Sequence, residues 1–207
     1  GAIPFLLESL GFPPIYGTAL TLGLLRNKLD EHELTTKALC HRVACRDRVV
    51  IGPFEVEFFR AAHSIVDGCG LAIHSPAGLI VHTGDFKLDP TPVDGQPTDL
   101  GRLAAYGEQG VLLLLADSTN IECQGRTLSD RTVGEALTKI LPDCHGKVLV
   151  ATFSSNIHRI QQVVDAAVAN QRKILISGRS MLANITIARQ LGYLNIPETA
   201  LVDLRQM

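Results

Sequence analysis

Three apolar runs in the second half of the chain place the strongest limit on how it can fold. They are "GVLLLLADS" (110–118), "GKVLVATFSS" (146–155) and "RKILISGRS" (172–180). The stretches between them, 129–141 and 156–170, carry apolar residues at helical spacing. Strands that are apolar on both faces and alternate with helices are typical of a parallel sheet covered on both sides. The sequence therefore predicts an α/β fold with a doubly wound parallel sheet in this half.

The first half follows another pattern, in which strands are joined by short turns. "FEVEFF" (54–59) alternates apolar and charged residues, which predicts a strand with one face in water. "GLAIHS" (70–75) and "GLIVHTGD" (78–85) flank a Pro-Ala-Gly turn, which predicts a hairpin. Asp99 is placed to cap a helix that runs to about Gly107. We expect the two halves to join somewhere after Asp117.

The composition excludes several classes of protein. The chain has 207 residues, of which 46% are hydrophobic and 19% charged, so it can bury a substantial core. Its net charge is −2, and binding to nucleic acid would therefore require a local groove. No run approaches the roughly 18 apolar residues that would cross a bilayer, so no membrane partner is expected. The five cysteines (Cys40, Cys45, Cys69, Cys123 and Cys144) lack CxxC spacing, which indicates a reducing cytoplasm and no disulfide framework.

Each of the three runs ends in polar residues, at 117–120, 154–156 and 177–180. Ligands of doubly wound sheets bind beyond the carboxyl ends of the strands, and free N–H groups at a helix start favour anions. Ser154 and Ser155 therefore fit a phosphate site, although serines at such positions also serve as simple helix caps. His158 and Arg159, in the first turn of the predicted helix, could reach the same anion or lie on its exposed face.

His63 and Asp85 are the candidate metal ligands. An imidazole and a carboxylate suit zinc or manganese, and a carboxylate can bridge two ions. Taken alone, however, a histidine before a serine is more often a hydrogen-bonding surface residue. A Thr-Gly-Asp sequence is likewise more often a turn, so both interpretations stay open on these residues.

Several motifs together resemble the ribonuclease J family, in the β-CASP branch of the metallo-β-lactamase superfamily. They are "AAHSIVDGCGLAIHSPAGLIVHTGDFKLD", "LLADSTN", "VGEAL", "ATFSSNIHRIQQVVDAAV" and "GRSM". The resemblance covers nearly the whole chain and is weakest at about 35–50. It implies that residues 1–125 are part of a metallo-β-lactamase domain, an αββα sandwich. Residues 126–207 would then be part of a doubly wound, parallel-sheet β-CASP domain.

The resemblance also implies roles for particular residues. His63 matches a lone metal-ligand histidine and Asp85 an aspartate that bridges two divalent ions, expected to be zinc, with manganese as the alternative. Asp117 matches the first acidic motif of the branch and is expected, with Asp85, to act in catalysis. The stretch Phe153–Ser155 matches one that holds RNA near a phosphate pocket, where we also expect His158.

The family activity would be metal-dependent hydrolysis of RNA, within the chain and from the 5′ end, in RNA maturation and decay. The HxHxDH ligand motif of the family would fall before Gly1, and its later histidine motifs after Met207. We therefore expect the isolated chain to be inactive or nearly so, and the parent protein to form a homo-oligomer, a dimer or tetramer. The alternative is a non-catalytic module that binds RNA or nucleotide phosphate. A receiver-like domain phosphorylated on Asp117 would explain only the run around 111–119.

Overall fold

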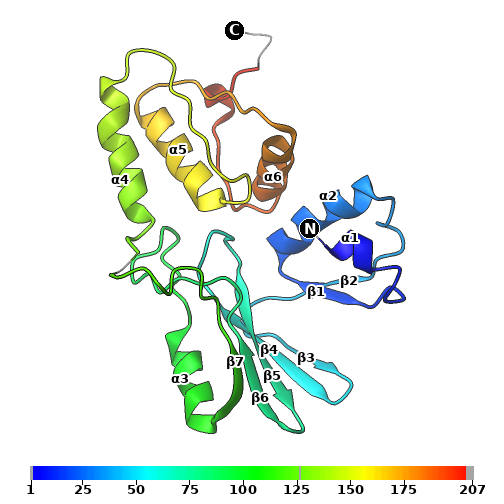
Figure 1. Cartoon of the computed structure of the whole chain (residues 1–207). Coiled ribbons are helices and arrows are strands. Elements are labelled where there is room, and N and C mark those ends of the chain that lie inside the picture. The colour runs from blue at the N-terminus through cyan, green and yellow to red at the C-terminus, as the bar shows by residue number, and fades with distance from the viewer. Residues whose placement is uncertain (1, 126, 204–207) are drawn as a thin grey trace. The chain divides into compact units, whose positions relative to one another are not determined.

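The computed structural model describes residues 2–125 and 127–203, which divide into two compact units (Figure 1). Within the described residues, the first unit consists of 2–63, 67–89 and 97–125. The second consists of 64–66, 90–96 and 127–203. Each unit is described by itself. The assignment of residues 1–125 and 126–207 to two named domains stays a prediction.

A five-stranded sheet forms the centre of the first unit. Its strands are β3 (Arg48–Ile51), β4 (Phe54–Arg60), β5 (Cys69–Ser75), β6 (Gly78–His82) and β7 (Val111–Leu115), in that spatial order. The first four pair antiparallel, and β7 runs parallel to β6. The predicted hairpin is confirmed between β5 and β6, where the Ser75 side chain bonds the Gly78 backbone.

Helix α3 (Leu100–Gln109) provides the crossover from β6 to the parallel strand β7. The side chain of Asp99 accepts a hydrogen bond from the backbone N–H of Arg102 at 3.1 Å, which confirms the predicted cap. A parallel pair cannot be joined by a tight turn, so a helix of this length is the expected connection.

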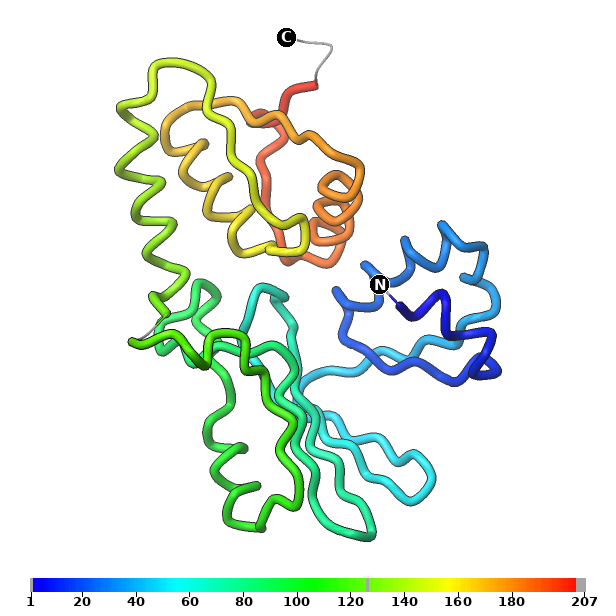
Figure 2. The backbone as a smooth tube through the Cα atoms, in the orientation of Figure 1, coloured from blue at the N-terminus to red at the C-terminus, as the bar shows by residue number. Residues whose placement is uncertain are grey.

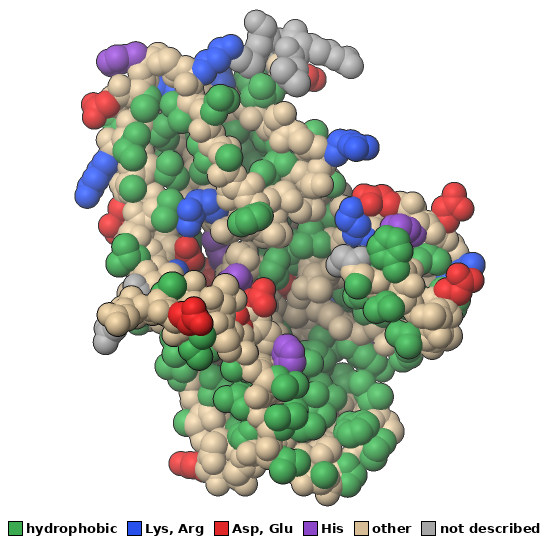
Figure 3. All heavy atoms as spheres, in the orientation of Figure 1, with side chains coloured by type: hydrophobic (Ala, Val, Ile, Leu, Met, Phe, Trp, Pro, Cys, Tyr) green, Lys and Arg blue, Asp and Glu red, His purple; other side chains and the backbone are tan. Residues whose placement is uncertain are grey.

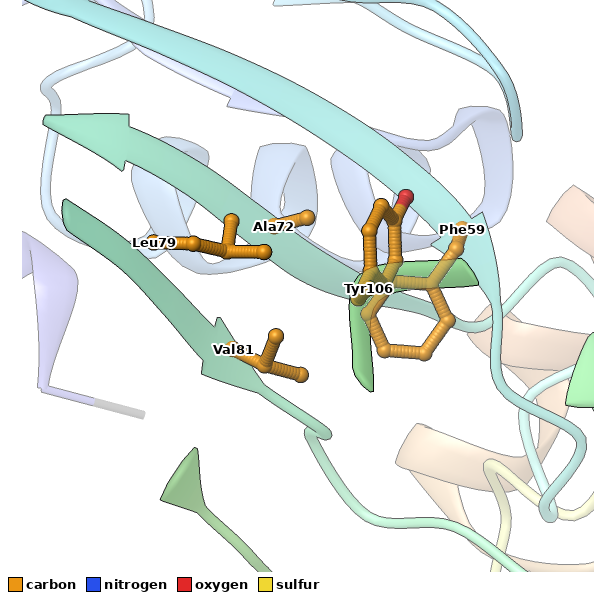
Figure 4. Packing of buried hydrophobic residues seen from close by; sticks show 5 residues of the cluster. All are labelled: Phe59, Ala72, Leu79, Val81 and Tyr106. Atoms are coloured by element: carbon orange, nitrogen blue, oxygen red, sulfur yellow. The ribbon is translucent and has the colours of Figure 1, made fainter. Parts of the chain in front are cut away.

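The helix α3 covers one face of the sheet and closes the main core of this unit (Figure 4). Buried side chains from the strands meet Tyr106 of α3; they are Phe59, Ala72, Leu79 and Val81. The rings of Phe59 and Tyr106 meet edge to face, with centroids 5.8 Å apart. Gly70 leaves room for this packing, because a Cβ at that position would lie 2.3 Å from the Phe59 ring.

The expected wet face of β4 is not wet at its centre. Glu57 is 2% exposed, because α3 covers this side of the strand and brings the guanidinium of Arg102 to 2.5 Å from the carboxylate. Arg48 of β3 adds a second contact at 2.9 Å. Alternation of charged and apolar residues predicted the strand correctly, but it could not show that two arginines compensate a buried acid.

A smaller part of the first unit precedes the sheet. It contains α1 (Ile3–Leu6), β1 (Ile15–Gly17), α2 (Ala19–Glu31) and β2 (Cys40–Arg42), with β1 and β2 parallel. The start of α2 is held by Asp67, whose carboxylate accepts hydrogen bonds from the Leu20 N–H at 2.8 Å and the Thr18 hydroxyl at 2.9 Å. Capping by a residue so distant in sequence ties this helix to the loop between β4 and β5.

The second unit is helical in its regular elements, as the tube in Figure 2 shows. They are α4 (Arg131–Ile140), the 3-10 turn η1 (Leu141–Asp143), α5 (Ile157–Ala169), α6 (Arg179–Gln190) and η2 (Glu198–Ala200). The helices predicted at 129–141 and 156–170 are confirmed. Ile157, Ile160 and Val164 form the buried stripe of α5, at the spacing of an amphipathic helix.

Two of the three apolar runs do not form regular strands within the described residues. Residues 146–153 have no strand pairing, and Leu149 is 96% exposed. The run at 172–180 makes only a single parallel bridge, between Ile174 and Leu201. A strand forms only where another backbone satisfies its N–H and C=O groups, and the described part of this unit supplies that at one point only. The α/β class is confirmed, but a regular parallel sheet is absent from residues 127–203.

The remaining run, at 110–118, does form a strand, β7, which pairs with β6 of the first unit. All five of its residues are exposed, and apolar side chains gather over the sheet on the face shown in Figure 3. Within residues 2–125 and 127–203, none of the helices has the length and apolar character needed to cross a membrane.

Candidate active site

The first unit brings three predicted site residues to one edge of its sheet. β4, β6 and β7 point the same way, because β5 is antiparallel to both of its neighbours and β7 is parallel to β6. Their carboxyl ends therefore lie along the same edge. His63 follows the last residue of β4, Asp85 follows β6 and Asp117 follows β7, each within three residues.

Hydrogen bonds join the loops that carry His63 and Asp85. The hydroxyl of Thr98, a buried residue, accepts from the backbone N–H of Ala62 and donates to the backbone oxygen of Lys87, each at 2.9 Å. The N–H of Lys87 in turn donates to the oxygen of Ala62 at 2.8 Å. The two loops are thus fixed to each other one residue from His63 and two residues from Asp85.

Asp117 is fixed to the same region through Thr83. Its backbone N–H donates to the Thr83 hydroxyl at 3.0 Å, and the Thr83 N–H donates to Leu115 at 3.0 Å. The carboxylate of Asp117 accepts from the Thr119 hydroxyl at 2.6 Å and from the Thr119 N–H at 3.0 Å. Its side chain is therefore held by two donors of the same residue, Thr119, just beyond the strand end.

These contacts lower the pKa of Asp117. The hydroxyl and the backbone N–H of Thr119 contribute most, and the backbone N–H of Phe86 and the nearby His63 act in the same direction. Hydrogen bonds and positive charge favour the ionised form of a carboxyl group. Asp117 is therefore an anion at neutral pH, in the electrostatic neighbourhood of His63.

His63 and Asp85 are both exposed, so their imidazole and carboxylate can reach a ligand from solvent. The donor types fit a zinc or manganese ion. Among the side chains that the structure describes, however, no three His, Cys, Asp or Glu residues converge closely enough to hold a metal. The described residues thus provide part of a ligand set, and a complete centre requires further donors.

The predicted RNA-binding residues lie in the second unit, at the start of α5. Asn156 caps this helix by accepting from the Arg159 N–H at 3.1 Å. Because Asn156 supplies the cap, Ser154 and Ser155 are not needed for it. The Ser154 hydroxyl accepts instead from the side-chain amide of Asn184 on α6 at 2.9 Å, and the ring of Phe153 is 83% exposed.

His158 and Arg159 each face an acidic residue of the second unit. The His158 Nε2 lies 3.7 Å from the carboxylate of Asp94. The Arg159 guanidinium donates to the carboxylate of Asp130 at 3.0 Å and to the Gln162 side chain at 3.1 Å. Arg159 therefore joins α5 to the start of α4. The side chain of His158 is 17% exposed, so it does not lie on an exposed face of the helix.

Comparison with known proteins agrees with the motifs. The sequence is 46% identical over 208 residues to a ribonuclease J of Helicobacter pylori strain J99, covering 100% of this chain and 30% of that protein. It is 43% identical to a ribonuclease J of Synechocystis (99% and 32%) and 46% identical to one of Thermus thermophilus (96% and 36%). The family model "Ribonuclease J, beta-CASP domain" matches residues 145–207.

The chain is similar over nearly its whole length to ribonucleases J. It spans about a third of the length of these curated relatives. A crystal structure of a protein of unknown function from Enterococcus faecalis V583 has the same fold, with a TM-score of 0.66 at 13% identity. The match covers 93% of this chain and 50% of that one.

Some residues of the site were not singled out from the sequence. Thr83 and Thr98, which join the three loops, are ordinary threonines in apolar or loop stretches and carry no local signal. Asp94 and Asn184 contact predicted site residues across 64 and 30 positions of sequence. Such contacts become visible only once the chain is folded.

Proposed function

We propose that this sequence contributes part of the active site of a ribonuclease that hydrolyses RNA phosphodiester bonds with the help of divalent metal ions. The observation that carries the proposal is the arrangement of His63, Asp85 and Asp117 after three strands that end at one edge, with their loops joined through Thr83 and Thr98. The ribonuclease J relatives support the class of reaction. The site belongs to a protein of the cytoplasm that acts within RNA chains and from the 5′ end, and that forms homo-oligomers.

Each residue has a defined part in this proposal. The His63 imidazole and the Asp85 carboxylate would be two of the ligands for divalent ions, zinc or manganese. Bound ions would supply positive charge that stabilises the charge developing on the phosphoryl oxygens. Asp117 orients a neighbouring group rather than taking up a proton, because a carboxylate with a lowered pKa is a weak base.

Residues of the second unit bind the RNA in this proposal. Phe153 offers an exposed ring on which a base can stack, and stacking tolerates any base. Ser154 and Ser155 contact the RNA backbone, which carries little sequence information. His158 adds charge toward a phosphate when it is protonated, and its pairing with Asp94 holds the imidazole in place.

The 207-residue chain alone is expected to cleave RNA poorly or not at all. The described residues do not bring three metal-binding side chains together, and two ligands cannot fix two ions. The test is a chimera in which this chain replaces the matching segment of the Helicobacter pylori ribonuclease J. We expect metal-dependent cleavage of RNA by the chimera and at least a hundredfold loss in its His63→Ala and Asp85→Asn variants.

The control is His145→Ala, which removes an exposed histidine of the second unit. Cleavage that His63→Ala and Asp85→Asn leave unchanged would refute the proposal. The second candidate, a non-catalytic RNA-binding module, is favoured by the exposed Phe153 beside two serines. It predicts that the chain binds RNA with an affinity that a chelator does not change, and that no variant of His63 affects it.

A further inference from the structure

The first unit contains a pair of cysteines whose sulfur atoms meet. The Sγ atoms of Cys45 and Cys69 are 2.7 Å apart, although the two residues are separated by 24 positions. The two are free thiols, and both are half-buried, so small molecules can reach them. A disulfide needs an S–S distance of about 2.05 Å, so only a small movement separates the two states.

The backbone around both cysteines is held by hydrogen bonds. Cys45 lies in the turn before β3, where Ala44 N–H donates to the Asp47 carboxylate at 2.8 Å and Phe58 N–H donates to the Asp47 oxygen at 3.0 Å. Cys69 is the first residue of β5 and pairs with Arg60 of β4. The sulfur contact is therefore a property of the folded sheet and does not depend on a loose loop.

The two thiols differ in chemical character. The hydrogen bond from Cys69 lowers the pKa of Cys45 despite burial, and the charge of Arg60 acts in the same direction. The same hydrogen bond, burial and the negative charge of Asp67 raise the pKa of Cys69. Since the thiolate is the reactive form, Cys45 is the attacking sulfur and Cys69 the second partner.

We propose that Cys45 and Cys69 form a peroxide-sensitive thiol pair that closes reversibly to a disulfide. The Cys45 thiolate attacks one oxygen of hydrogen peroxide, which breaks the O–O bond, releases hydroxide and leaves a sulfenic acid. The Cys69 sulfur then attacks the sulfenic sulfur, and the S–S bond forms as water leaves. Each cysteine sulfur is oxidised by one electron overall, and the peroxide accepts both electrons.

The position of the pair gives the disulfide a structural consequence. Cys69 directly follows the β4–β5 loop that carries His63, and its thiol lies 3.6 Å from the backbone oxygen of Asp67, the residue that caps α2. The Cys45 thiol contacts Gly68 in the same loop. A disulfide would therefore link the connection between β2 and β3 to the C-terminal end of the β4–β5 loop. This inference stands whether or not the proposed function holds.

The experiment treats the full 207-residue chain with hydrogen peroxide, blocks the remaining thiols and digests it with trypsin without reduction. We expect peptide 43–46 to be joined to peptide 61–87, and a thiol reductant to separate them. A variant with serine at positions 40, 123 and 144 keeps the pair as its only thiols and is expected to cross-link equally well. In that background Cys45→Ser is expected to abolish the cross-link.

Two results would overturn the proposal. One is oxidation of Cys45 to sulfinic acid without a link to Cys69 in the variant that keeps only this pair. The other is cross-linking of Cys40 or Cys123 in the unmodified chain at the rate of Cys45 with Cys69, since both are exposed and have no sulfur partner among the described residues. Circular dichroism of each reduced variant shows that it is folded before the test.

Discussion

The backbone N–H of Asp117 donates a hydrogen bond to the side-chain hydroxyl of Thr83, at 3.0 Å. Thr83 lies at the end of β6, two residues before Asp85, and donates its own hydroxyl hydrogen to the oxygen of Gly84 at 2.7 Å. One buried side chain thus sets the spacing between two acidic residues that follow different strands. This contact joins residues 34 positions apart and is not visible in the sequence.

We predict that Thr83→Val lowers the free energy of unfolding by about 1–3 kcal/mol, because it leaves the partly buried N–H of Asp117 without its acceptor. The substitution keeps the size of the side chain, so no cavity forms. Thr83→Ser retains the hydroxyl and serves as the control. Urea unfolding of the three proteins measures the effect, and a Thr83→Val protein as stable as the Ser variant would contradict it.

Removing a donor to Asp117 is expected to raise the pKa of its carboxyl group. Thr119→Val deletes the hydroxyl that lies 2.6 Å from the carboxylate and keeps the backbone N–H. We therefore predict that the pKa moves upward toward its ordinary value, as NMR titration of the side-chain carboxyl carbon would show. Ser118→Ala is the control, because the Ser118 hydroxyl donates to Ala116. An equal shift in both variants would show that Thr119 has no special part.

The direction of this shift also fixes its effect on stability. The folded pKa of Asp117 lies below that of the unfolded chain. Its ionised carboxylate therefore favours folding at pH values above the unfolded pKa. That contribution is lost as the pH falls through the lowered, folded value. In Thr119→Val, stability should change less with pH between the folded and the unfolded pKa of Asp117.

Glu57→Gln is predicted to destabilise the first unit by roughly 1.5–3 kcal/mol, the usual worth of hydrogen bonds to a charged group. Burial raises the pKa of Glu57, but the hydrogen bond and charge of Arg102 and the charge of Arg48 act against it, and the net pKa is lowered, so the native residue is ionised. The amide would leave Arg102 without its anion. Glu55→Gln is the matched control, since Glu55 pairs with Arg48 in an exposed position and such pairs are worth about 0–1 kcal/mol. Thermal unfolding that ranks the two variants equally would disprove the buried role of Glu57.

Phe153→Ala is predicted to weaken RNA binding by about 1–3 kcal/mol, the value of one base stacked on an aromatic ring. Phe153→Tyr keeps the ring and should bind nearly as well. Leu149→Ala provides a control for the loss of exposed apolar surface, because Leu149 is also exposed but has no aromatic face. Fluorescence anisotropy with a short single-stranded RNA measures all four proteins. Equal losses for Phe153→Ala and Leu149→Ala would contradict stacking.

Local signals in the sequence predicted local structure well. The turn at 76–78 and the helix α5 were predicted because a Pro-Ala-Gly turn and an apolar stripe at helical spacing act within a few residues. His63, Asp85 and Asp117 were found because residues after apolar runs reach the edge of a sheet, and because of the family motifs. The structure brings all three to one edge, as the direction of the strands requires.

Features that depend on distant partners were not predictable in the same way. Residues 148–151 are all apolar, as β7 is, but whether they become a strand depends on a neighbouring backbone, which the described residues do not provide. The buried state of Glu57 depends on Arg102, 45 positions later. The pairing of Arg159 with Asp130 spans 29 positions. No pattern within one element records such contacts.

The most direct test of the central claim is the metal content of the chimera with the Helicobacter pylori ribonuclease J. After dialysis against zinc and then against metal-free buffer, elemental analysis gives the zinc retained per molecule. If the edge formed by β4 and β6 provides metal ligands, His63→Ala and Asp85→Asn must retain less zinc than the parent chimera, and His145→Ala must retain the same amount. Unchanged zinc in both site variants would contradict the account.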